Sequence, residues 1–535
     1  MNKTSSTPFD FRSSLLIPNW QDNFITLVDE LQIDAICNEQ DKRIINYLNN
    51  MSNNIKRDNF LLSLPFLIQR INGCIVALFA AEGAKKNSLQ LTSVVPYVNF
   101  IVTGDKQYLD MTDPKFIDIT HSFEEKRLKT AFLRRIIRTA SWEKPWRLFK
   151  TVFYPNIYAL GHSKVLIEHA RKSDERIYFF QSNELTAKIF KNSNKDFSPP
   201  YLNSLVSDFI TTLTGHIKIK SIYYDNFKIL IERIIYKKVL EDSLALDACY
   251  NYTKLPKNIW ISTGLAHNYR MLALAVLRRG GKVTSFGHAT GTVFAPTRDS
   301  LFYGEFAVTN DFIDITKDAS DLLKSYFFDK YPSAINSPFQ ISGANNNSTF
   351  KNKVKKKSKN KKPTVIYTSN TVLDIERCTP FSHSMAYFNW QLKLTDILDK
   401  MNINLICQPH PEGIFAMQDI THPLRKKYHM PKARFDDVKD QADVFLVDFV
   451  HSTTFGEILV TDKPIVRINW NDDSNYIGVA KHIKVLLDKR CRSISACFQE
   501  CGSLEVNEEE LNNAILTNWQ EKVDSTDFRK LLLGK

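Results

Sequence analysis

A histidine held between two prolines is the first residue with clear chemical potential. His410 lies between Pro409 and Pro411, directly after the apolar run 403–407 that predicts a β-strand. The prolines restrict the backbone, so the imidazole has a defined direction. A histidine held in this way can hydrogen-bond a phosphate group or help to neutralise a departing phosphate. A turn histidine that only caps its neighbours is the alternative interpretation.

Hydroxyl side chains open a helix later in the same region. The run 444–447 predicts a strand, and the loop after it contains Ser452, Thr453 and Thr454 before a helix that includes Glu457. Hydroxyls at a helix start cap free N–H groups, and together with the helix dipole these groups can form an anion site. Glu457, one turn inside, could accept hydrogen bonds from a ribose or another sugar. Capping alone explains Ser452 or Thr453 equally well.

Further polar residues follow predicted strands of this region. They are Ser369, Asn370, Gln408 and Glu412. In open parallel sheets, ligands bind beyond the carboxyl ends of the strands. We therefore expect these residues to join His410 and the Ser452 segment at one ligand-binding edge.

A second histidine stands among small residues after the strand predicted at 282–286. The segment reads Gly287, His288, Ala289, Thr290, Gly291, Thr292. The small neighbours leave room for a substrate, and a histidine can act as the general base for a hydroxyl acceptor. A buried histidine satisfied by the backbone is the alternative. Other candidate bases or nucleophiles are Asp299, Glu305, Asp311 and His267.

Alternating strands and helices are predicted to position these residues. A strand at 258–263, a helix at 266–279 and a strand at 282–286 form a βαβ unit, which implies a parallel sheet. The region after residue 363 repeats this alternation, with strands at 364–368, 403–407, 444–447 and 464–468 and helices at 384–401 and 476–487. Such alternation predicts a doubly wound α/β domain.

The first 250 residues are less regular. Segments 159–171 and 227–240 predict helices, and 176–181 predicts a strand. The architecture expected from the whole pattern is an N-terminal α/β domain with added helices, a linker, and a second α/β domain that faces it.

Length and composition indicate a globular chain of two or more domains. The 535 residues are 43% hydrophobic, 12% aromatic and 24% charged, which excludes a mostly disordered protein. The most apolar stretch, 60–81, is interrupted by polar residues, so we expect no membrane-spanning helix. The polar N-terminus predicts no signal peptide, and eight cysteines without a Cys-x-x-Cys pair favour reduced thiols. A cytoplasmic protein is expected.

The net charge of +13 is concentrated in two segments. Residues 351–362 contain eight lysines, and residues 124–150 carry a surplus of six, so the rest has 13 − 8 − 6 = −1. Residues 343–363 predict a lysine-rich linker. Residues 124–150 interleave basic and aromatic side chains, which is typical of an element on an anionic membrane surface, although a core-facing helix with a solvated basic side is equally compatible. A basic nucleic-acid-binding protein is the alternative of another class.

Several chemistries lack their motifs. The chain contains no Gly-x-x-x-x-Gly-Lys loop, no Gly-x-Gly-x-x-Gly, no His-Glu-x-x-His and no Gly-x-Ser-x-Gly. No Asp-x-Asp triplet is present, which disfavours a transferase that binds its donor through a metal on such a triplet. We therefore expect no cofactor and no metal.

The motifs after residue 363 resemble those of glycosyltransferases with the GT-B fold. A His-Pro after one strand, a Ser/Thr pair that opens a helix with a following Glu, and the strand beginning at Lys463-Pro464 carry this resemblance over residues 363–487. The pattern is similar to bacterial sialyltransferases and Kdo transferases, which use CMP-activated acids, and to CDP-glycerol phosphotransferases. These families commonly carry an acidic triplet in the N-terminal domain, where this chain has Gly287-His288-Ala289.

The resemblance implies two Rossmann-like, doubly wound domains facing a cleft, with extra helices on the first. The expected boundaries are 1–342 for the acceptor-binding domain, 343–363 for the linker and 364–535 for the nucleotide-sugar-binding domain. His410, Pro411, Ser452, Thr453 and Glu457 would bind the donor nucleotide, and His288 would deprotonate the acceptor. In a double displacement, Asp299 or Glu305 would be the nucleophile.

The expected partners are a nucleotide-activated sugar, preferably a CMP-linked acid, and a glycan or lipid-linked glycan of capsule or lipopolysaccharide assembly. A CDP-glycerol-type phosphotransferase and a UDP- or GDP-sugar transferase remain alternatives, as does a catalytically idle scaffold with this fold. No nucleic-acid partner is expected.

Overall fold

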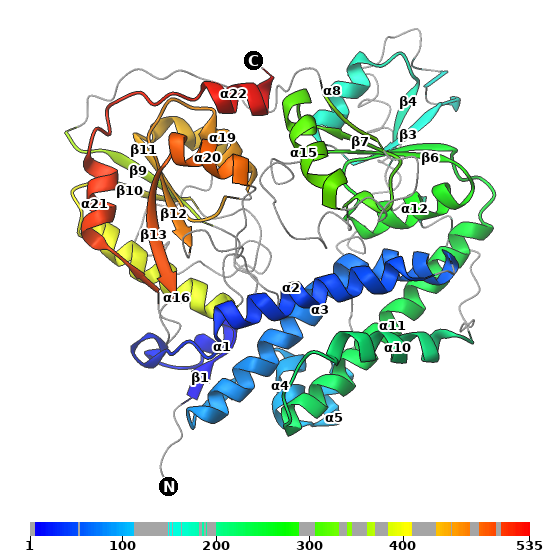
Figure 1. Cartoon of the computed structure of the whole chain (residues 1–535), viewed down its shortest axis with the longest axis horizontal. Coiled ribbons are helices and arrows are strands. Elements are labelled where there is room, and N and C mark those ends of the chain that lie inside the picture. Colours follow the sequence, from blue (N-terminus) through cyan, green and yellow to red (C-terminus); the bar gives the residue numbers. More distant parts are fainter. Residues whose placement is uncertain are drawn as a thin grey trace.

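The chain folds into an α/β structure with two separate six-stranded, mostly parallel sheets (Figure 1). The structure is a computed structural model. The described residues are 6–51, 54–111, 148, 150–151, 153–161, 163–180, 185–186, 189, 200–287, 305–330, 340–344, 361–369, 383–408, 435–450, 452–470, 481–498 and 504–534.

The first sheet is parallel throughout. Its strands are β3 (Ile157–Leu160), β4 (Ile177–Phe180), β5 (Asn258–Ile261), β6 (Lys282–Phe286), β7 (Asp311–Asp314) and β8 (Gln340–Gly343). In space they run β4-β3-β5-β6-β7-β8. Helices cover both faces, as a parallel sheet requires.

Alternate residues of each strand face different helices. Ile259 and Ile261 pack with α12 (His267–Arg278), whereas Trp260 belongs to the core formed with α8 (Lys164–Lys172) and α15 (Lys317–Lys330). The apolar residues of β5 are therefore divided between two layers of helices.

The second sheet has the same plan with one antiparallel edge. Its strands are β9 (Thr364–Thr368), β10 (Asn404–Gln408), β11 (Val444–Val447), β12 (Ile465–Trp470), β13 (Arg492–Phe498) and β14 (Leu504–Val506), and they lie in the order β10-β9-β11-β12-β13-β14. Only the β13–β14 pair is antiparallel. The accompanying helical segments are α16 (Ser384–Asp399), α18 (Phe435–Val438), η3 (Lys439–Gln441), α19 (Thr453–Leu459), α20 (Lys481–Arg490), α21 (Glu508–Leu516) and α22 (Thr526–Leu533).

A layer of long helices lies beside the sheets, in blue and green at the bottom of Figure 1. It consists of α2 (Glu30–Asn49), α3 (Asn54–Lys86), α4 (Pro96–Thr103), α5 (Lys106–Met111), α10 (Leu202–Thr214) and α11 (Ile222–Asn251). Within the described chain, α3 alone is long and apolar enough to cross a membrane, and 72% of its most apolar window is buried in the fold. Burial of this extent is typical of a core helix.

Both ends of the described chain connect distant parts of the fold. Near the N-terminus lie β1 (Ser6–Pro8), α1 (Phe11–Ser14), η1 (Trp20–Asn23) and β2 (Gln90–Thr92). His383, just before α16, donates from Nε2 to the carbonyl oxygen of Phe9 at 2.7 Å. At the other end, α22 packs on α15, and Thr316 Oγ1 donates to the carbonyl oxygen of Leu531 at 2.5 Å. The two sheets are thus linked through both termini.

Most sequence-predicted elements are confirmed. The strands predicted at 258–263, 282–286, 364–368 and 444–447 correspond to β5, β6, β9 and β11, and the helix predicted at 227–240 lies within α11. The helix predicted at 159–171 is wrong at its start, because Ile157–Leu160 form β3 and the helix begins after Ser163, whose hydroxyl caps it. Most of the predicted linker and of the basic segment 124–150 lies outside the described residues.

Candidate functional site at the carboxyl edges of the sheets

Each sheet has a point where the strand order reverses. In the first sheet the chain passes from β3 outward to β4 and then returns to β5 on the other side of β3. In the second sheet β9 is followed outward by β10, and then β11 lies on its other side. Ligands of open α/β sheets bind beyond the carboxyl ends of the strands at such reversals. The side chains at these two reversals are therefore the first candidates for a ligand site.

A buried polar network lies at the carboxyl end of β5. His267 is the first residue of α12, and its side chain is 40% exposed. Its Nε2 lies 2.8 Å from Oδ1 of Asp242, a residue of α11 that is completely buried. Lys238, one helical turn earlier, is 4% exposed and places Nζ 2.7 Å from the same Oδ1 and 3.2 Å from His267 Nε2. Ser63 Oγ donates to Asp242 Oδ2 at 2.5 Å.

The charges of this network keep Asp242 ionised. Burial tends to raise the pKa of Asp242, but the charges of His267 and Lys238 and their hydrogen bonds outweigh burial and hold the pKa below its ordinary value. In the neutral state of His267 in which Nε2–H donates to Asp242, the ring lone pair is on Nδ1. No residue in the described part of the chain hydrogen-bonds Nδ1. His267 is thus an oriented, partly exposed imidazole with an available basic atom.

Glu305 holds the turn that leads from β5 to His267. Its carboxylate accepts hydrogen bonds from Gly264 N–H at 2.8 Å, Thr263 Oγ1 at 2.8 Å and Ser285 Oγ at 3.2 Å, and the residue is 4% exposed. A Cβ at Gly264 would lie 2.2 Å from the carbonyl oxygen of Glu305, so only glycine fits there. These contacts indicate a positioning role. Direct catalysis by Glu305 stays a prediction.

Most of the other site residues predicted near the first sheet lie outside the described residues. Gly287 follows β6 and donates its N–H to the carbonyl oxygen of Ile313 at 2.9 Å. Five predicted residues lie outside the described residues: His288, Thr290, Gly291, Thr292 and Asp299. Asp311, the alternative carboxylate, is the first residue of β7 and is therefore at the opposite, amino end of the strands.

At the second sheet, Ser452 caps α19. Its Oγ accepts a hydrogen bond from Phe455 N–H at 3.0 Å, and Thr453 and Thr454, which begin the helix, are half-buried. Ser369 follows β9 and Gln408 ends β10, both half-buried at the carboxyl edge. Four predicted donor-site residues lie outside the described residues: Asn370, His410, Pro411 and Glu412.

Glu457 is part of an ion-pair cluster. Lys439 Nζ lies 3.2 Å from Glu457 Oε2 and also pairs with Asp436. Burial raises the pKa of Glu457, and Lys439 opposes this rise. Burial also tends to raise the pKa of Asp436, but Lys439 and, more weakly, Lys164 lower it below its ordinary value. Lys164 begins α8, which follows β3, so a charge near the carboxyl end of β3 acts on Asp436.

Another buried carboxylate directly follows β11. Asp448 is 1% exposed, and its Oδ2 accepts hydrogen bonds from Tyr367 at 2.6 Å and Tyr387 at 2.8 Å. Burial, followed by the charge of Asp448, raises the pKa of Tyr367 well above its ordinary value. Asp448 therefore fixes the carboxyl end of β11, beside the strand reversal.

The sequence did not indicate Asp242, Lys238 or Ser63 as site residues. The four-residue spacing of Lys238 and Asp242 places both on one face of a helix, but that spacing is common on solvated helices. His267 was only one of several alternatives. Among the described residues, no group of three or more His, Cys, Asp or Glu side chains is placed to hold a metal ion.

No protein-family model matches the chain, and no curated protein matches it. A solved complex of S. aureus MnaA with UDP is 12% identical, covers 70% of this chain and 90% of that chain, and has a TM-score of 0.32. A trehalose-6-phosphate synthase, studied for enzymatic glycosyltransfer with retention, is 12% identical, covers 70% and 95%, and has a TM-score of 0.33.

Proposed function

We propose that the chain is a GT-B glycosyltransferase that uses no metal ion. Its donor would be a nucleotide-activated sugar, preferably a CMP-linked acid of the Kdo or sialic type. The acceptor would be a growing glycan of capsule or lipopolysaccharide. The observation that carries this proposal is the His267–Asp242 pair at the strand reversal of the first sheet. A partly exposed imidazole oriented by a buried carboxylate is the arrangement that a general base requires.

In the proposed reaction, His267 removes the proton from an acceptor hydroxyl at Nδ1. The hydroxyl oxygen forms a bond to the anomeric carbon of the donor, and the bond from that carbon to the phosphate oxygen breaks. The leaving nucleotide keeps the electron pair. Asp242 stabilises the imidazolium that forms. Base catalysis of this kind contributes about 10²–10⁴-fold to a rate. His288 remains the alternative base, and Asp299 or Glu305 remains the nucleophile of a double displacement.

The donor would bind at the carboxyl edge of the second sheet. The sequence-predicted contacts are Ser369, Asn370, Gln408, His410, Pro411, Glu412, Ser452, Thr453, Thr454 and Glu457. Support comes from the half-buried positions of Ser369 and Gln408 beside the β9–β11 reversal. We also propose two domains, 1–342 and 364–535, with facing carboxyl edges. The packing of α22 on α15 and the hydrophobic cluster that contains residues of both sheets support their association. We further propose a cytoplasmic location, with residues 124–150 on an anionic membrane.

A nucleotide panel followed by a base variant tests the proposal. Binding of CMP, CDP, UDP, GDP and TDP is measured by calorimetry, and nucleotide release is then measured with the sugar conjugate of the nucleotide that binds best. We expect CMP to bind best. His267→Ala should lower turnover at least 100-fold while nucleotide affinity changes less than twofold. His216→Ala, a half-buried histidine after α10, is the matched control and should retain turnover.

Two outcomes would overturn the proposal. If none of the five nucleotides binds, the chain is not a nucleotide-sugar transferase. If His267→Ala retains turnover and His288→Ala loses it, the base is His288 and the role given to the Asp242 pair is wrong.

A further inference from the structure

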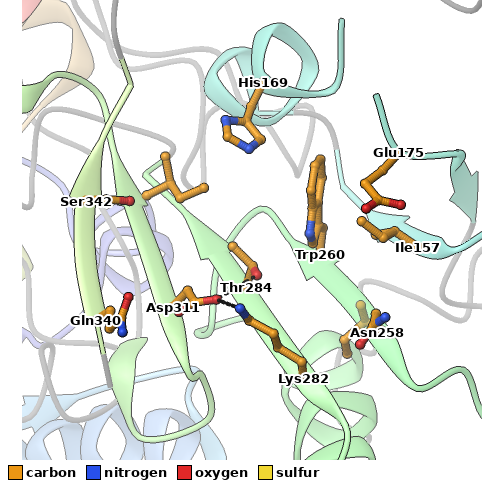
Figure 2. A pocket seen from close by; sticks show the side chains of 12 residues that line it. Ile157, His169, Glu175, Asn258, Trp260, Lys282, Thr284, Asp311, Gln340 and Ser342 are labelled. Carbon is orange, nitrogen blue, oxygen red and sulfur yellow. Dashed lines mark hydrogen bonds and ion pairs between the residues drawn. The ribbon is translucent and has the colours of Figure 1, made fainter. Parts of the chain in front are cut away.

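A cavity of about 440 Å³ opens on one face of the first sheet, away from the carboxyl edge. Its floor is formed by the amino-terminal halves of neighbouring strands. Asn258 and Lys282 begin β5 and β6 and are paired in register, and Asp311 and Gln340 begin β7 and β8 and are paired in the same way. Figure 2 shows these side chains along the floor. The volume is within the range of small-molecule sites, about 300–1,000 Å³.

Aromatic rings form the upper wall of this cavity. His169 extends from the last turn of α8 over Trp260 of β5, and their ring centroids are 5.1 Å apart (Figure 2). Phe286 packs behind both rings, 5.4 Å from His169 and 5.2 Å from Trp260. The wall is held rigidly, because Trp260 is only 8% exposed and belongs to the core between the sheet and α8.

The polar groups on the floor supply both donors and acceptors without a large net charge. Lys282 Nζ lies 2.7 Å from Asp311 Oδ2, so these two charges neutralise each other. Glu175, at the rim, accepts a hydrogen bond from Asn156 at 2.7 Å. Burial, and after it the charge of Lys172, lowers the pKa of His169, so this imidazole is neutral near pH 7. Among the described residues that line the cavity, Lys282 is the only lysine or arginine, and Asp311 neutralises it, so a phosphate group is a poor match.

Several hydrogen-bonding groups at the cavity have no partner among the residues that the structure describes. The side chains of Asn258, Gln340 and Ser342 are exposed, and within the described part of the chain they make no hydrogen bond. The imidazole nitrogens of His169 likewise have no partner among the described residues. Amide, hydroxyl and imidazole groups beside an aromatic wall match a ligand that has apolar C–H faces and hydroxyl groups on one ring.

We propose that this cavity binds an uncharged sugar unit, as a second carbohydrate site separate from the carboxyl edge. The ring C–H face would pack against Trp260 and His169, and the hydroxyls would bond Asn258, Gln340 and the Lys282–Asp311 pair. The site lies at the amino ends of the strands, whereas His267 follows the carboxyl end of β5. It would therefore hold part of a glycan away from any reacting group, and it does not depend on the transferase proposal.

Saturation-transfer NMR with the full chain tests this site. The probes are the neutral disaccharides lactose, maltose and chitobiose, with the acidic sugar N-acetylneuraminic acid and the nucleotide CMP for comparison. We expect at least one neutral disaccharide to bind. The double variant Asn258→Ala/Gln340→Ala should weaken binding of that disaccharide at least fivefold and leave CMP binding unchanged. Asn404→Ala is the control, since Asn404 also begins a parallel strand and is exposed; it should change the affinity less than twofold.

A second variant tests the charge argument. Asp311→Asn removes the negative partner of Lys282 and leaves the ammonium group uncompensated. It should therefore weaken binding of the neutral disaccharide and strengthen binding of the acidic N-acetylneuraminic acid at least threefold. The proposal is overturned if no neutral disaccharide binds the wild-type chain. It is equally overturned if the Asn258/Gln340 variant and the Asn404 control bind the disaccharide alike. Loss of CMP binding alone would count against the transferase proposal and not against this cavity.

Discussion

Replacing Asp242 with asparagine should strongly destabilise the protein. Asp242 is completely buried and compensates the ammonium group of Lys238, which is 4% exposed and 2.7 Å away. At an effective dielectric constant of about 20, two unit charges at this distance attract each other by about 6 kcal/mol. Desolvation offsets part of this attraction, and breaking a buried pair from one side typically costs about 3–5 kcal/mol. The nearest other carboxylate, Glu241, is 3.7 Å away and 56% exposed, so it compensates only in part.

Urea unfolding measures this change. We expect Asp242→Asn to lower the free energy of unfolding by about 3 kcal/mol at pH 7. Asp247→Asn, an exposed residue on the same helix, is the control and should change it by less than about 0.5 kcal/mol. If the two variants are equally stable, the charges of Lys238 and Asp242 are not coupled as the distances require.

The same pair has a defined pH dependence. Because the pKa of Asp242 is lowered in the folded protein, its contribution is present above the ordinary value of 3.8 and is lost as the pH falls through the lower folded value. The stability difference between wild type and Asp242→Asn should therefore not shrink between pH 8 and pH 5. It should shrink only in stronger acid. A difference that shrinks between pH 7 and pH 5 would refute this assignment.

Three further changes should affect stability in urea unfolding. Glu305→Gln weakens a buried acceptor of three hydrogen bonds, so it should lower the free energy of unfolding by about 1–3 kcal/mol. An unchanged free energy of unfolding would contradict this role. His383 is buried with its pKa lowered to about 4 by burial, so the wild type should lose up to about 3 kcal/mol as the pH falls from about 6.5 to about 4. His383→Gln should lack that loss. Gly161→Ala places a Cβ 2.0 Å from Ser262 Oγ at a residue whose φ is +92°. It should lower the free energy of unfolding more than the control Gly280→Ala, where φ is +70° but no atom lies within 4 Å of the added Cβ.

The sequence determined the main elements of the two sheets. The apolar runs at 258–263, 364–368 and 444–447 are short and bounded by polar residues, and each became a strand buried by neighbours on both sides. The run that begins at Ala159 was predicted as a helix because a short apolar run does not distinguish a buried strand from a helix. Its pairing with β4 and β5 made the first residues a strand.

Only the tertiary structure decided which polar groups meet. The hydrogen-bonded partners of this network are far apart in the sequence. Ser63 and Asp242 are separated by 179 residues, and Asp242 also contacts His267, so no local pattern predicts that these side chains meet. The packing of α11 against α3 and α12 brings them together and removes Asp242 from water. Burial is what turns an ordinary Lys/Asp pair on a helix into a strongly coupled charge network, because charges interact more strongly where water is excluded. The sequence thus supplied the histidine at the strand end, and the helix packing supplied the carboxylate that orients it.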